Sequence, residues 1–241
     1  QHGVEATAAN NHMVTWMNCR FTNCTSDGMN TNSLTQYWNI INCRFDNNGA
    51  MGYNHNGSQY GMVYKCLFDN NASSGAQIGG VARVANCVSY NNQGYGLIMN
   101  SMNSVVCDCV FVENKLDGVQ VPTTSTNSTS NWVGNVCSGN TGYGVEISDN
   151  SSESAWFNTV ITDNVGGSLD DGSEAMQHTI MHNTNETGSV NFRDTANLDF
   201  TPTSTSSVIG SNWPSWMLIY GSTAGNSGMI NWVNTDSSST F

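Results

Sequence analysis

The sequence NCRFTN at 18–23 returns as NCRFDN at 42–47, and these two copies decide how the rest of the chain is interpreted. Further copies are KCLFDN at 65–70, NCVSYN at 86–91 and DCVFVEN at 108–114. Degenerate copies are expected further on, which gives key positions 19, 43, 66, 87, 109, 136, 159 and 179, separated by 20 to 27 residues. A period of about 23 residues with tolerated insertions is typical of a solenoid.

Each copy contains the alternation of a β-strand. Its Cys and Phe lie two residues apart, which puts both side chains on one face. A second extended segment follows a polar turn, as in GYGLIM at 94–99 and GYGVEI at 142–147, and glycine and asparagine supply the backbone angles of such a corner. A third short strand precedes each Cys, for example at 62–64 and 104–106. Three strands per turn of about 23 residues predict a parallel β-helix.

The stacked Asn-Cys-x-Phe and Gly-Tyr-Gly-Val-x-Ile patterns resemble those of right-handed parallel β-helix proteins of the pectate-lyase-like superfamily, over roughly residues 12–200. We therefore expect an all-β fold, a right-handed parallel β-helix (solenoid) of about 8–10 coils with a C-terminal cap. The β-helix is assigned to residues 1–200, and a closing strand and cap segment to 201–241. This fold carries lyases, hydrolases, epimerases, adhesins and phage spikes, so the resemblance leaves the function open.

The residues after 201 break the repeat. A Ser/Thr-rich stretch is followed by a concentration of apolar side chains at Trp213, Trp216, Met217, Leu218 and Ile219. A cap made of this segment would cover the unpaired strand edges and the core at the open end of the solenoid. The alternative is an aromatic docking surface for a glycan or a partner subunit, and one segment could serve both roles.

Stacked coils place equivalent side chains above one another, about 4.8 Å apart. This predicts an internal column of Cys19, Cys43, Cys66, Cys87 and Cys109, beside a column of Phe21, Phe45, Phe68 and Phe111. It also predicts a corner ladder of Asn23, Asn47, Asn70 and Asn91. Parallel side chains in one pleat seldom reach the torsion of a disulfide, so most of the eight thiols should be free. Disulfides are the alternative, and without a CxxC pair or a Cys/His cluster we predict no metal site.

The charge balance limits the partners. Six Lys and Arg residues stand against 18 Asp and Glu residues, so the net charge is −12. Few basic groups disfavour nucleic acid and anionic membrane surfaces, and no apolar run predicts membrane insertion. The polar, Lys-poor composition is typical of an extracellular, cell-surface or virion protein. The expected partners are protein subunits of an extracellular assembly or a surface glycan, and an oligomer is compatible with this composition.

The resemblance implies that a lyase would need an Arg or Lys base and acidic residues that hold Ca²⁺. The nearest match is formed by Arg44, Asp46, Asp69 and Lys65, with Arg20 beside them, all predicted to face outward on the first three coils. The preferred interpretation is a set of solvated cross-strand ion pairs, each contributing less than about 1 kcal/mol. No cofactor is predicted, and Ca²⁺ is required only by the lyase alternative.

A glycoside hydrolase would need paired carboxylates. The candidates are Asp163, Asp170, Asp171 and Glu174, although no Gly-His-Gly motif accompanies them, and a polar loop that captures a cation or plain surface is the preferred interpretation. His55 is predicted to lie in a surface loop between coils, which makes it a poor candidate for a base.

Outward aromatic side chains can stack on sugar rings, and the glycan-contact candidates are Trp38, Tyr95, Tyr143 and Trp156. Packing at the corners would explain these residues equally well. Because the chain has few charges and no recognised catalytic set, the sequence favours a non-catalytic structural or adhesive β-helix module on a virion or cell surface that contacts glycan. The alternative is a polysaccharide lyase or glycoside hydrolase.

Overall fold

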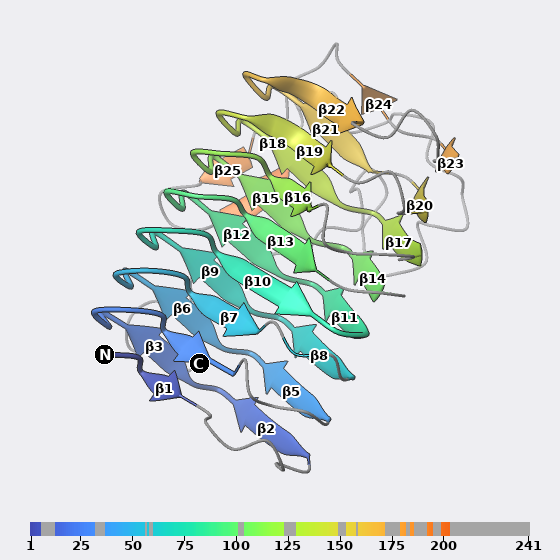
Figure 1. The fold of residues 1–241 in the computed structure, drawn as a ribbon. Helices are drawn as coiled ribbons and strands as arrows, with labels where there is room; N and C mark the ends of the chain where they lie inside the picture. The colour runs from blue at the N-terminus through green and yellow to red at the C-terminus, as the bar shows by residue number, and fades with distance from the viewer. Residues whose placement is uncertain are drawn as a thin grey trace.

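The computed structural model describes residues 1–202 except 6–12, 32–36, 56, 58–59, 101–103, 123–128, 149–152, 158, 172–178, 182–183, 186–191 and 195–198. The described residues contain strands and no helix, and three long parallel sheets run along a solenoid (Figure 1). Each coil gives one short strand to each of these three sheets, and each of the three has eight strands within the described residues. The predicted parallel β-helix is confirmed. Most of the expected cap, residues 203–241, lies outside the described residues.

The strands recur in the same order in every coil. The first sheet contains β1 (Val4–Glu5), β4 (Met29–Asn30), β7 (Tyr53–His55), β10 (Ala76–Gly79), β13 (Leu97–Asn100), β16 (Val119–Val121), β19 (Tyr143–Ile147) and β22 (Gly167–Asp171). The second contains β2 (Val14–Met17), β5 (Trp38–Ile41), β8 (Gly61–Tyr64), β11 (Ala82–Ala85), β14 (Ser104–Cys107), β17 (Thr129–Val133), β20 (Glu153–Phe157) and β23 (Thr179–Met181). The third contains β3 (Arg20–Thr22), β6 (Arg44–Asp46), β9 (Leu67–Asp69), β12 (Val88–Tyr90), β15 (Val110–Val112), β18 (Val136–Ser138), β21 (Val160–Thr162) and β24 (Thr184–Asn185). A separate antiparallel pair consists of β25 (Phe192–Asp194) and β26 (Asp199–Pro202).

Two corners of each coil are set by residues with a left-handed backbone. Between the second and third sheets, φ lies between 52° and 68° at Asn18, Asn42, Lys65, Asn86, Asp108 and Gly134. After the third sheet, φ lies between 50° and 66° at Asn23, Asn47, Asn70, Asn91, Glu113, Gly139 and Asp163. Asparagine and glycine tolerate this region better than other residues. The repeat motif therefore begins and ends with Asn because these are its two corners.

The core lies inside the coils, as the repeat predicts. Cys43, Cys66 and Phe45 are fully buried, and Cys87 and Phe68 are each only 3% exposed. These side chains come from the corner and the inward face of the third sheet, and they stack on their equivalents in the next coil. The predicted burial of both columns is confirmed for these residues.

The phenylalanine column contains a true ring stack in its first three coils. The ring centroids of Phe21 and Phe45 are 4.9 Å apart, and those of Phe45 and Phe68 are 5.1 Å apart, with nearly parallel planes. Ser89 takes the equivalent position in the next coil and separates Phe68 from Phe111. The column is therefore continuous in register, but its aromatic stacking is interrupted at Ser89.

Two expected repeat positions, 136 and 179, are wrong. Val136 pairs with Val110, so Asn135 occupies the position of Cys109, and the left-handed Gly134 precedes it. Thr179 lies in β23 of the second sheet, whereas the matching third-sheet strand is β24. Once the Cys and Phe are lost from the motif, both neighbouring strands are short and apolar, so the pattern no longer distinguishes one sheet from the other.

The buried asparagine ladder lies one residue after the predicted one. It consists of Asn48, Asn71, Asn92, Asn114, Asn140 and Asn164. From Asn71 onward, each Oδ1 accepts from both the backbone N–H and the Nδ2 of the preceding asparagine; for Asn92 these distances from Asn71 are 3.0 and 2.9 Å. The Nδ2 of Asn92 also donates to the Phe68 carbonyl at 3.0 Å. The predicted ladder residues occupy the left-handed corner instead, and of these Asn91 bonds to Asn70 at 2.7 Å.

Glycines pack directly against this ladder. They recur at Gly28, Gly52, Gly75, Gly96 and Gly118. A Cβ on Gly118 would lie 2.6 Å from the Gly144 carbonyl oxygen and 2.9 Å from the Asn140 Nδ2. No side chain fits between the ladder and the backbone of the next coil, so glycine is required here by close approach.

Candidate functional site

The residues proposed for a lyase form an ion-pair ladder on the third sheet. The Arg20 guanidinium donates two hydrogen bonds of 2.8 Å to Asp46, and the Arg44 guanidinium donates bonds of 3.0 and 2.9 Å to Asp69. Arg44 also lies 3.5 Å from Asp46. The side chains of both aspartates are 0% exposed. The structure thus brings Arg44, Asp46 and Asp69 together, and it corrects the expectation of solvated pairs because the arginines cover the carboxylates.

The two aspartates respond differently to this environment. Burial opposes ionisation of Asp46, but hydrogen bonds from Arg20 and the charge of Arg44 outweigh it and lower the pKa of this carboxyl. Burial raises the pKa of Asp69 despite its hydrogen bonds from Arg44. Lys65 stays apart on the exposed corner before β9, with its Nζ 5.4 Å from the centre of the Tyr64 ring. The arginines and aspartates of this ladder therefore hydrogen-bond to one another.

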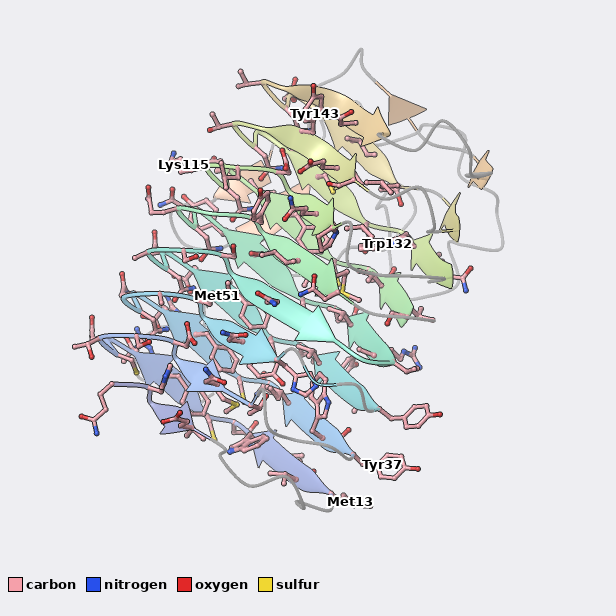
Figure 2. All side chains as sticks on the ribbon, in the orientation of Figure 1. Met13, Tyr37, Met51, Lys115, Trp132 and Tyr143 are labelled. Carbon is pink, nitrogen blue, oxygen red and sulfur yellow. The ribbon has the colours of Figure 1, made fainter. Side chains whose placement is uncertain are left out.

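Trp38 is not an outward aromatic residue, and that prediction is wrong. It is 0% exposed and lies in the core, with its ring centroid 4.4 Å from His55 and 5.7 Å from Tyr53. Its neighbour Tyr37 is 55% exposed and projects away from the solenoid (Figure 2). Since side chains alternate along a strand, an error of one residue in phase exchanged the two faces.

The predicted position of His55 in a surface loop is also wrong. It lies in strand β7, 0% exposed, and its Nδ1 is 3.0 Å from the Thr31 hydroxyl and 3.1 Å from the Thr31 carbonyl oxygen. The carbonyl can only accept, so Nδ1 carries the proton. Burial lowers the pKa of His55 to about 4. The expected surface loop is therefore wrong, because the polar sequence around this histidine concealed an inward-facing strand.

Tyr95 and Tyr143 lie where the sequence placed them, at equivalent positions: Tyr95 precedes β13, and Tyr143 is the first residue of β19. Both are partly exposed, and Figure 2 shows Tyr143 at the far end of the solenoid from Met13. Trp156 lies in β20, where its backbone is in register with Trp132, and its side chain is outside the described set. Two of the four aromatic candidates thus remain on the surface.

Polar groups connect Tyr95 to Glu146, which lies in the same strand as Tyr143, across the first sheet. The Gln120 Nε2, from β16, donates to the Tyr95 hydroxyl and to the Glu146 Oε2, both at 3.0 Å. The Ser148 hydroxyl donates to the Glu146 Oε1 at 2.9 Å. These bonds hold the side chains in one orientation. We call Tyr95, Asp117, Gln120, Tyr143 and Glu146 the tyrosine face.

The glycines that pack against the asparagine ladder, together with Gly144, are called the column glycines. The residue that precedes each column glycine alternates between two kinds. Asp27, Ser74 and Asp117 accept a hydrogen bond from the backbone N–H of the equivalent residue one coil later, which is Met51, Tyr95 and Tyr143 respectively. For Met51 the distance is 3.0 Å and for Tyr95 it is 3.2 Å. A short acceptor therefore alternates with a large side chain, and each tyrosine is fixed at its backbone by the residue beneath it.

Asp117 is the carboxyl most strongly altered on this face. Burial, followed by hydrogen bonding with Glu146, raises the pKa of Asp117 to about 7, and the charge of Asp170 adds to this. Asp117 is 6% exposed. A carboxyl that keeps its proton near neutral pH is what general-acid chemistry requires.

We expect Asp117→Asn to stabilise the protein at pH 8 and to lose that advantage near pH 5. The raised pKa means that folding takes up a proton between the unfolded value of about 4 and the folded value of about 7, so the wild type gains stability as the pH falls through this window. Asparagine keeps the acceptor for Tyr143 but carries no charge at any pH. Urea unfolding of both proteins at pH 8 and pH 5 measures this, and a difference that is independent of pH would contradict it.

Sequence reasoning missed Asp117, Gln120 and Glu146. The signal was available, because Asp117-Gly118 aligns with Tyr95-Gly96 and Tyr143-Gly144 once the glycines are stacked. Of the hydrolase candidates, Asp170 pairs with Glu146 in register, Asp163 occupies an exposed corner, and the backbone of Asp171 lies opposite Ile147. Glu174 lies outside the described residues.

The part of the chain that the structure describes contains neither a three-ligand metal cluster nor a membrane-spanning helix. No group of three or more His, Cys, Asp or Glu side chains in this part of the chain is arranged to hold a metal ion. Nor do these residues form a helix with the length and apolar character needed to cross a membrane.

Comparison with known proteins identifies the architecture. A family model described as "Right handed beta helix region" matches residues 1–133, and no curated protein matches the chain. The crystal structure of the periplasmic alginate epimerase AlgG is similar over 70% of this chain and 47% of its own, with 16% identity and a TM-score of 0.53. Pectate lyase Pel9A is similar over 82% of this chain and 64% of its own, with 13% identity and a TM-score of 0.45. The chain therefore spans about half the length of the epimerase, and at this identity the likeness concerns the fold alone.

Proposed function

The chain belongs to the right-handed β-helix family, and from that premise we propose that it is a glycan-contacting module that binds a neutral saccharide chain along the tyrosine face. The observation that carries this proposal is the fixed row of Tyr95, Gln120 and Glu146, with Tyr143 beside it. Aromatic rings with a few oriented amide and carboxylate groups are the combination that recognises sugars, which have apolar ring faces and hydroxyl edges.

The spacing of the tyrosines suits an extended ligand. Tyr95 and Tyr143 occupy one column two coils apart, which corresponds to about 9.6 Å along the solenoid. Asp117 and Gln120 come from the coil between them. A saccharide chain that runs along the solenoid axis would meet one ring, then polar groups, then the second ring.

Electrostatics favour a neutral ligand over an acidic one. The chain has a net charge of −12, and the tyrosine face adds Glu146 and the neighbouring Asp170 without a basic side chain among its named residues. An anionic polysaccharide would be repelled from this face unless cations bridged the charges. The lyase alternative is weakened further because Arg44, its proposed base, already donates to Asp69.

A second function, glycoside hydrolysis, is favoured by one observation. Asp117 has its pKa raised to about 7 beside Glu146, so Asp117 can hold a proton near neutral pH and donate it. In this scheme Asp117 is the acid and Glu146 the base or nucleophile, and an entering sugar has to separate the two hydrogen-bonded carboxyls to the distance of about 5–9.5 Å that glycosidases use. The choice between a non-catalytic module and a hydrolase is therefore a choice about these two residues.

The location and partners follow from the same proposal. We place the protein outside the cytoplasm, on a cell surface or virion, where saccharide chains are met, with protein subunits of an extracellular assembly as further partners. The low content of lysine and arginine and the polar surface support this placement.

The test is binding to a panel of neutral and acidic polysaccharides, with Tyr95→Ala and Tyr143→Ala compared against Tyr37→Ala. Tyr37 is an exposed control in a different column, stacked on Tyr60 with ring centroids 5.7 Å apart. We expect each face variant to weaken binding of a neutral polysaccharide about tenfold, equivalent to about 1.4 kcal/mol, and the control to bind as wild type. Binding that survives both face variants would overturn the proposal.

The same panel decides the catalytic question. New reducing ends that disappear in Glu146→Gln, while binding persists, would establish the hydrolase. Unsaturated products that require Ca²⁺ would instead support a lyase and contradict both candidate functions of this face. Binding without any product supports the non-catalytic module.

A further inference from the structure

The interior of the β-helix contains a stacked row of five cysteine thiols, which have no role in the proposed saccharide binding. Cys19, Cys43, Cys66, Cys87 and Cys109 occupy one position in consecutive coils, and all five are free. Cys19 is partly exposed, and the other four are buried. We call these five residues the thiol column.

All five sulfurs adopt one orientation. Each Sγ lies 3.2 to 3.4 Å from the carbonyl oxygen of the residue two positions earlier. In the four later coils each Sγ also lies 3.5 to 3.8 Å from a carbonyl oxygen of the coil beneath. Because the arrangement repeats with the coil, the spacing of the sulfurs equals the strand spacing of about 4.8 Å.

The carbonyl oxygens next to the thiols have other hydrogen-bond donors and do not depend on the thiol protons. The carbonyls of Ile41, Tyr64, Ala85 and Cys107, which the thiols contact, already accept backbone N–H groups at 2.8 to 3.1 Å. Loss of a thiol proton would therefore leave no buried acceptor without a donor, and the usual cost of an orphaned group does not arise.

The backbone also points donors at the sulfurs. The N–H of Cys66 donates to the Cys87 Sγ at 3.5 Å, and the N–H of Cys87 donates to the Cys109 Sγ at 3.4 Å. Donors directed at sulfur stabilise a thiolate, which is the form that binds metal. These donors reach Cys87 and Cys109, whereas burial raises the pKa of the Cys66 and Cys109 thiols, so a bound metal ion has to displace the thiol proton itself.

We propose that the thiol column binds soft monovalent metal cations of the Cu(I) and Ag(I) class, each held between two successive sulfurs. Soft thiolate ligands select such ions. A metal–sulfur bond of about 2.3 Å, as for zinc, makes two collinear bonds span about 4.6 Å, close to the sulfur spacing. Linear coordination needs only two ligands, so it is compatible with the lack of a three-ligand group among the described residues.

The charge balance suits a buried site. Each cation replaces one thiol proton, which leaves to solvent, and the neighbouring sulfur supplies its lone pair, so no sulfur is oxidised. One positive charge leaves as one enters, and the core gains no net charge. Entry begins at Cys19, the thiol of the column that is partly exposed, beside Met17, which is 52% exposed.

The test is titration of the folded protein with Ag⁺, followed by native mass spectrometry. Five sulfurs have four gaps, so we expect four ions per wild-type chain. Cys66→Ser interrupts two gaps and should leave two ions, whereas Cys19→Ser at the exposed end should leave three. Cys24→Ser, a thiol outside the column, should leave four.

Near-UV circular dichroism confirms that each protein remains folded, and silver X-ray absorption should show two sulfur neighbours per ion. If Cys66→Ser does not fold, Cys19→Ser against Cys24→Ser carries the comparison. The proposal is overturned if the folded wild type binds no Ag⁺, if every Cys→Ser change removes one ion equally, or if binding abolishes the native circular dichroism signal.

Discussion

Replacing Asn92 by leucine should lower the free energy of unfolding by about 2–6 kcal/mol, although the side chains are similar in size. The Asn92 Oδ1 accepts the backbone N–H of Asn71, and its Nδ2 donates to the Phe68 carbonyl. Both partners lie inside the coil corner, and each buried group left without a partner costs about 1–3 kcal/mol. Equilibrium urea unfolding measures the difference.

A neighbouring substitution provides the control. Gln93 is exposed, and its backbone N–H bonds to the Asn71 carbonyl, so Gln93→Leu changes an amide to leucine without touching the ladder. We expect this control to stay within about 0.5 kcal/mol of wild type. Equal losses in the two variants would show that the ladder does not carry the stability assigned to it.

Phe45→Ala should cost about 3–5 kcal/mol, the range for removing a large aromatic side chain from a packed core. Phe45 is 0% exposed and is stacked on both sides, by Phe21 and Phe68. The cavity opens between two rings that are fixed by their own coils, so collapse around it is limited.

The end of the same stack serves as the comparison. Phe21 is partly exposed and has one ring neighbour, so Phe21→Ala should cost less than Phe45→Ala. Thermal and urea unfolding of both variants should rank them in this order. A loss below about 1 kcal/mol for Phe45→Ala would falsify the assignment of this ring to the core.

Much of the fold was predictable because the residues at the corners of each coil are easy to recognise in the sequence. The Asn-Cys pairs mark left-handed positions, and the Cys-x-Phe spacing gives the inward face of the third sheet. Prediction failed where the motif lost those markers, as at Asn135, and where a single-residue shift exchanges faces, as at Trp38. Because side chains alternate between the two faces of a strand, a shift of one residue moves each of them to the wrong face.

The candidate site was harder to predict because it depends on neighbours in different coils. Tyr95 and Tyr143 were found from their shared glycine context, but Gln120 became part of the site only when its amide reached both Tyr95 and Glu146. No local pattern marks a residue whose role is set by contacts about 25 positions away. The buried asparagine ladder shows the same limit, since the sequence indicated a ladder but placed it on the corner residue.

The residues before the column glycines alternate from coil to coil, and this alternation determines how many coils the β-helix can gain or lose at once. Asp27, Ser74 and Asp117 serve as acceptors for the large residues one coil later, so the chemical repeat in this column is two coils and not one. Deletion of a single coil would bring two acceptors or two bulky side chains into succession, whereas deletion of a pair would restore the sequence of partners. Duplication and loss during the evolution of this chain are therefore expected to favour even numbers of coils, and engineered versions should follow the same parity.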